Sequence, residues 1–201
     1  MNLNQTSLDT VCAALCEIMG VDAPQMAAVA NGELVQYARH AFDGSCADRI
    51  FMYNPDAIAQ WVAEKYPWFL QEVEEKTELQ LPLRSVMPSV TPVCFATMYT
   101  GAQPEVHGIQ KYEKPVLTID TIFDALLRAG KKCAIVAYGK SSMGRIFLER
   151  EMDYYICESV PQANARAVEL ILRDEHDFIA VYNGNYDSVM HKNGPENPLS
   201  L

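Results

Sequence analysis

The chain has 201 residues, 49% of them apolar, and a formal net charge of −10 at pH 7. This length is enough for one substantial hydrophobic core, so we expect one main domain. The acidic balance argues against a basic patch for nucleic acid or for an anionic membrane surface, and no apolar run approaches the length of a membrane span.

The N-terminus and the cysteines indicate a cytoplasmic protein. The first six residues lack the basic and then apolar arrangement of a signal peptide. The six cysteines form no C-x-x-C pair and lie mostly within apolar patterns, which is typical of reduced core residues rather than of a disulfide framework.

Residues 1–45 read as a helical N-terminal extension. Apolar residues at helical spacing predict one helix over 8–19, a Pro-initiated second helix over 22–30 and a possible third over 33–40. Such an extension could cover a sheet edge or mediate homo-oligomerisation. The remaining residues, 46–201, form the predicted core.

Strands and helices alternate along this core. The pattern predicts strands over 49–53, 132–137, 154–156 and 177–182, and helices over 91–100, 121–129 and 163–173. This order predicts an α/β fold, a three-layer α/β/α sandwich with a mostly parallel sheet.

One predicted helix begins with a hydroxyl. Thr91 is a natural N-cap, Pro92 fits the first helical position, and Gly101 is a plausible C-terminal stop. A hydroxyl there meets free backbone N–H groups and the positive end of the helix dipole, which favour a phosphate or sulfate group. The alternative interpretation is that Thr91 only caps its helix.

Two further segments carry candidate metal ligands at strand ends. Asp187 and His191 are four residues apart, so one helical turn places carboxylate and imidazole on one face, just after an apolar strand. Asp56 follows the first predicted strand, and taken alone it is interpreted as the N-cap of a helix through Val62. Carboxylate and imidazole are ordinary ligands of zinc, and manganese or iron could use them too.

These three segments together resemble the alkaline phosphatase superfamily, most closely its type I phosphodiesterase/nucleotide pyrophosphatase branch. In that branch a strand-end Asp precedes a P-x-x-T…TG…P-x-x-HGI pattern and then D-x-x-x-H-x-x-GP. Here the three parts are Asp56, residues 88–109 and residues 187–195. The resemblance covers most of residues 49–195.

The resemblance implies a hydrolase of small-molecule phosphate esters, with diesters favoured over monoesters, and a site for two divalent metals. Zinc is the expected metal, with manganese or iron as alternatives. Asp56 and Thr91 would contact one metal, and Asp187 and His191 would hold the other. Thr91 would be the nucleophile, because metal coordination can lower the pKa of a hydroxyl.

The sequence also departs from the family pattern. The family places a further Asp-His pair and a later His downstream, whereas this chain ends six residues after Pro195. We therefore expect a fold that is incomplete at its C-terminus, and as the alternative function a truncated or degenerate non-catalytic relative that binds a ligand or partner. Cys94 stands where relatives often carry a phosphate-contacting Asn. Lys192 is a possible phosphate contact or a solvated lysine.

Overall fold

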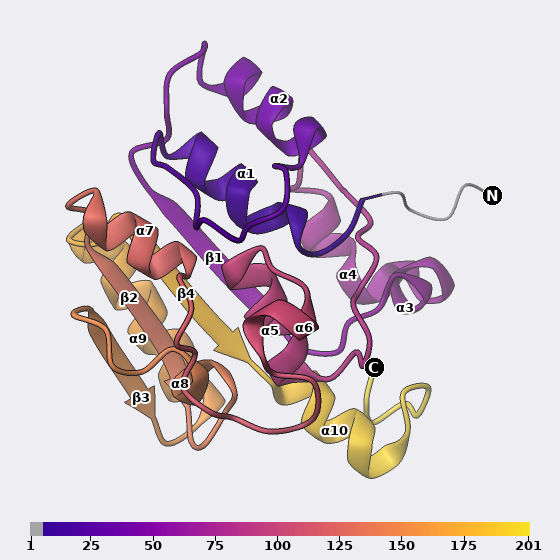
Figure 1. Cartoon of the computed structure of the whole chain (residues 1–201). Helices are drawn as coiled ribbons and strands as arrows, with labels where there is room; N and C mark the ends of the chain where they lie inside the picture. Colours follow the sequence, from indigo (N-terminus) through magenta and orange to yellow (C-terminus); the bar gives the residue numbers. More distant parts are fainter. Residues whose placement is uncertain (1–5) are drawn as a thin grey trace.

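A computed structural model describes residues 6–201, and its centre is a four-stranded parallel sheet (Figure 1). The spatial order is β1-β4-β2-β3, so the last strand lies between the first two. Ala180 of β4 pairs with Met52 of β1 on one side and with Ile135 of β2 on the other. All four strands point the same way, so their carboxyl ends share one edge. The strands are β1 Ile50–Pro55, β2 Cys133–Tyr138, β3 Asp153–Cys157 and β4 Phe178–Asn183.

Helices cover both faces of this sheet, as predicted. On one face, α1, α5, α7 and α8 enclose the larger hydrophobic core, which contains Tyr99, Phe123 and Phe178. On the other face, α9 packs Leu170 against β2 and β4. The structure therefore confirms an α/β/α arrangement. The helices are α1 Thr10–Ile18, α2 Gly32–Ala41, α3 Gln60–Lys65, α4 Pro67–Glu74, α5 Thr91–Thr100, α6 Pro104–His107, α7 Ile122–Arg128, α8 Met143–Ile146, α9 Val160–Arg173 and α10 Asn185–Asn193.

The predicted N-terminal extension is only partly helical. The first and third predicted helices are present as α1 and α2, but the helix predicted over 22–30 is wrong, because this segment forms a turn flanked by irregular chain. The backbone of this segment forms a hydrogen bond with the end of α5 instead: the Ala28 N–H donates to the Gly101 carbonyl at 2.7 Å. Helix α1 contributes Cys12 and Cys16 to the larger core, so it packs directly on the α/β unit.

The cysteines are free, as expected. Cys12, Cys16 and Cys133 are buried, whereas Cys46 is exposed, contrary to the prediction of a core position. Among residues 6–201, no helix is long and apolar enough to cross a lipid bilayer. The residues that bear on a signal peptide are mainly 1–5, which lie outside the described residues.

Candidate active site

Thr91 lies at the start of α5 but does not cap it. Val90 is the capping residue, and Thr91 is the first residue of the helix, followed by Pro92. The Thr91 hydroxyl makes no capping hydrogen bond and donates instead to Asp56 Oδ2 at 3.1 Å. The interpretation of Thr91 as a simple cap is therefore wrong, because its side chain is directed to another segment.

Asp56 occupies the turn immediately after β1. Its N–H donates to the Asn183 carbonyl at 2.8 Å and extends the β1–β4 pairing by one step. Helix α3 begins only at Gln60, so Asp56 does not cap it, and the cap interpretation is wrong here too. The next residue, Ala57, has a φ of +64°, a left-handed conformation that is unfavourable for a residue with a Cβ. The turn is thus held in a strained shape beside the carboxylate.

Tyr182, at the end of β4, is the residue that the sequence analysis missed. Its hydroxyl donates to Asp56 Oδ2 at 2.8 Å, so two hydroxyls share one carboxylate oxygen. Burial, and then the charge and hydrogen bond of Asp56, raise the pKa of Tyr182 well above its usual range, which keeps it a neutral donor. Stacking on Tyr138, with ring centroids 5.5 Å apart, holds the ring in place.

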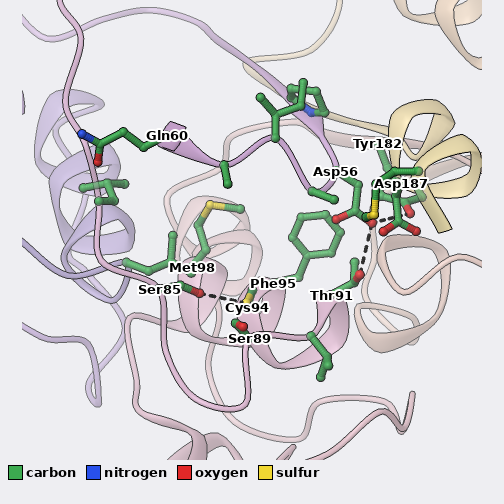
Figure 2. Close-up of a pocket in the computed structure, with 18 of the residues that line it drawn as sticks. Asp56, Gln60, Ser85, Ser89, Thr91, Cys94, Phe95, Met98, Tyr182 and Asp187 are labelled. Carbon is green, nitrogen blue, oxygen red and sulfur yellow. Dashed lines mark hydrogen bonds between the residues drawn. The ribbon is translucent and has the colours of Figure 1, made fainter. Parts of the chain in front are cut away.

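Asp187 and His191 lie on one face of α10, as their spacing predicts. His191 Nε2 is 3.3 Å from Asp187 Oδ1, and the imidazole side chain is 74% exposed. Desolvation, and next the charge of Asp56, raise the pKa of Asp187, while His191 lowers it. Two carboxylates thus face the same region, and Figure 2 shows Asp56, Tyr182 and Asp187 grouped together. Their mutual repulsion would be relieved by a cation.

Cys94 and Lys192 differ in position. Cys94 lines the same cleft as Thr91, and its Sγ is 3.3 Å from Ser85 Oγ (Figure 2). Desolvation raises the pKa of this thiol, so it is a neutral, weak donor. Lys192 is exposed on α10 and is not among the residues that line the cleft. Their substrate-binding roles stay predictions.

The donors present match a divalent metal in kind. Two carboxylates, one imidazole and one hydroxyl are hard or borderline ligands of the type that zinc and manganese accept. In the described part of the chain, however, no three His, Cys, Asp or Glu side chains gather into one potential metal site. The structure brings together two pairs instead, Asp56 with Thr91 and Asp187 with His191.

Comparison with known protein families places this site in context. Residues 53–119 match the family model described as type I phosphodiesterase / nucleotide pyrophosphatase. This match confirms the predicted family resemblance over residues 53–119; beyond residue 119 the resemblance stays a prediction. The matched residues include Asp56 and Thr91, while Asp187 and His191 lie beyond them. No curated protein gives a significant match to the chain.

Residues 53–119 also contain a buried histidine with a structural role. His107 Nε2 lies 3.0 Å from Thr97 Oγ1, and His107 Nδ1 accepts a hydrogen bond from the Ile109 N–H. Burial lowers the pKa of His107 to about 4, so it is neutral at pH 7. His176 is likewise paired, with Asp153, before the start of β4 and far from its site-forming end. Both histidines are buried and hydrogen-bonded, and neither lines the cleft.

Proposed function

We propose that the chain is a metal-dependent hydrolase of phosphate esters, with diesters favoured over monoesters. The observation that carries this proposal is the hydrogen bond from Thr91 to Asp56 at the N-terminus of a helix, in a cleft of about 1810 Å³. The family match supports the phosphate ester as substrate class. Thr91 as nucleophile, the use of metal and the preference for diesters are parts of the proposal.

The residues of the site divide the chemistry between them. Asp56 Oδ2 accepts the Thr91 proton in a hydrogen bond and so orients the hydroxyl oxygen toward the cleft. The positive end of the α5 dipole, at Thr91, favours binding of the phosphoryl oxygens. Thr91 Oγ1 then gives its proton to Asp56 and forms a bond to phosphorus, while the bond from phosphorus to the alcohol oxygen breaks and that oxygen takes up a proton from water. Water next adds to phosphorus, the bond from phosphorus to Oγ1 breaks, Oγ1 regains its proton, and the remaining phosphate group (a monoester, when the substrate is a diester) is released.

A bound divalent metal would supply charge to this site. Asp56 and Thr91 would hold one ion, and Asp187 and His191 would hold a second. The metals would lower the pKa of the Thr91 hydroxyl and stabilise the charge on the departing oxygen. Zinc is the metal that we propose, with manganese and iron as alternatives.

The direct test compares a chromogenic phosphodiester with the matching monoester after chelation and then with added zinc or manganese. We expect metal-dependent turnover that is faster on the diester, is lost in Thr91→Ala and is partly kept in Thr91→Ser. Thr118→Ala, an exposed threonine outside the cleft, is the matched control. Metal-dependent turnover that persists in Thr91→Ala would exclude Thr91 as the nucleophile.

A second function is favoured by the ligand pairs described above. Because the described residues hold no group of three metal ligands, a non-catalytic protein that binds a phosphate ester or a partner is the alternative. Mass spectrometry of the protein quenched during turnover separates the two. A phosphate adduct on the peptide with Thr91 supports the enzyme, whereas ligand binding without adduct or turnover supports the binding protein.

A further inference from the structure

The cleft continues well beyond Thr91 along α5. Thr91, Cys94, Phe95 and Met98 all line it, and their spacing places them on one face of the helix. With a rise of 1.5 Å per residue, Met98 lies about 10 Å further along the helix than Thr91. Figure 2 shows this order, with Thr91 and Asp56 at one end and Met98 and Gln60 toward the other. The helix therefore forms a floor that leads away from the proposed nucleophile.

Aliphatic side chains line the same cleft as this floor. They are half-buried, they come from five separate parts of the chain, and we call them the apolar wall: Leu8, Ile58, Leu70, Leu81, Leu83 and Met98. None of them offers a hydrogen-bonding group or an aromatic plane. They would therefore contribute little to recognition of a nucleoside, which depends on stacking and on paired polar groups.

Contacts at both sides hold the wall in place. On the α3–α4 side, Lys65 and Tyr66 bind Glu196, and Phe69 packs on Tyr186 of α10 with ring centroids 5.4 Å apart. On the other side, the Leu8 N–H donates to the Arg84 carbonyl at 3.0 Å, which links residues 77–85 to the start of the chain. The apolar wall is thus already formed without ligand, and it is continuous with the proposed active site.

We propose that the apolar wall binds an alkyl chain on the alcohol group of the phosphate ester. The phosphoryl group would lie at Thr91, and the chain would follow the α5 floor to Met98. This inference rests on the proposed function, because it assumes that a phosphate ester occupies the Thr91 end. Burial of the methylene groups of the ligand against these half-buried aliphatic side chains would provide the favourable free energy of binding.

The test measures binding by calorimetry, without turnover. The ligands are O-alkyl methylphosphonates from ethyl to decyl, kept below their critical micelle concentrations, and the protein is the unmodified chain in chelator or Thr91→Ala with zinc. We expect affinity to rise about two- to fourfold for each added methylene until the wall is filled. Affinity that does not depend on chain length would overturn the inference.

Substitutions in the apolar wall test whether the dependence of affinity on chain length arises there. Leu70→Gln and Met98→Gln should each weaken binding of the longest ligand about tenfold and leave the ethyl ligand almost unchanged. Met26→Gln is the matched control, because Met26 is 53% exposed and lies outside the cleft. Leu70 is not part of the core clusters, so its variant remains informative if Met98→Gln unfolds. A chain-length effect that both folded variants leave intact would also overturn the inference.

Failure of the proposed function gives a different result. If Thr91 is not a nucleophile, turnover does not depend on it, yet the chain-length dependence of binding can still be measured in both proteins. If the wall binds no alkyl chain, Thr91-dependent turnover can still occur, but with equal affinity for short and long esters. The two assays therefore fail independently.

Discussion

The Tyr182 hydroxyl lies 2.8 Å from Asp56 Oδ2, the same oxygen that accepts the hydrogen bond of Thr91. Parallel pairing makes this contact possible, because Pro55 of β1 is in register with Asn183 of β4. Asp56, which follows Pro55, and Tyr182, which precedes Asn183, therefore lie close together at the carboxyl edge of the sheet. Tyr182 leaves Asp56 Oδ1 available for another ligand and fixes the plane of the carboxylate.

Tyr182→Phe should impair the site without disturbing the fold. The variant keeps the ring and its stack on Tyr138 but removes one of the two donors to Asp56. Loss of a group that orients a metal ligand typically lowers metal affinity or activity by about 10- to 100-fold. Competition with a chromophoric chelator measures zinc affinity directly, and Tyr138→Phe is the matched control. Equal zinc affinity of Tyr182→Phe and the unmodified chain would contradict this role.

Most of the fold follows from local patterns in the sequence. The apolar runs that became β2 and β4 are buried on both faces, and such runs identify central parallel strands. Gly101 and the capping box at Thr121 mark helix ends through local chemistry alone. By contrast, the segment 22–30 carries helix-favouring residues, but its backbone pairs with the end of α5 instead. A contact between distant segments overrides propensity there.

The site was predictable in outline only. Strand-end positions and motif spacing single out Asp56, Thr91, Asp187 and His191 as candidates, but they do not tell a helix cap from a side chain directed into the cleft. That distinction depends on the hydrogen bond between Thr91 and Asp56, which joins residues 35 positions apart. Tyr182 carries no motif, and its only sequence signal is its place at the carboxyl end of a predicted strand.

Asp187→Asn should make the metal-free protein more stable at neutral pH. The folded state raises the pKa of Asp187 above its ordinary value of 3.8, so the folded protein binds this proton more tightly than the unfolded chain. Stability is therefore lost as pH rises from 3.8 through the raised pKa, and the loss persists at pH 7. Thermal unfolding in chelator should show a higher midpoint for the variant at pH 7 and no difference below pH 3. Equal unfolding midpoints at pH 7 would show that the ionised Asp187 carboxylate does not destabilise the folded protein.

His107 should make the protein sensitive to acid. The folded state lowers its pKa to about 4 from an ordinary value of 6.5, so the unfolded chain takes up the proton first. Stability is thus lost as pH falls from 6.5 to about 4, by about 3 kcal/mol at most from this residue. His107→Gln should be less stable than the unmodified chain at pH 7, with a smaller difference at pH 4, in urea unfolding. His40→Gln, at an exposed position, should keep the full acid sensitivity.

Gly101→Ala should destabilise the junction between α5 and the N-terminal segment. Gly101 has a φ of +71°, and a Cβ there would lie 2.8 Å from Ala27 Cα, a backbone atom that cannot move aside alone. The left-handed conformation costs about 1 kcal/mol and the overlap about 1–3 kcal/mol more. Gly130→Ala separates the two effects, because Gly130 has a φ of +76° but open space around it. Chemical denaturation should show a loss of about 2–4 kcal/mol for Gly101→Ala and about 1 kcal/mol for Gly130→Ala. Equal losses would mean that residues 22–30 do not pack on α5 in solution.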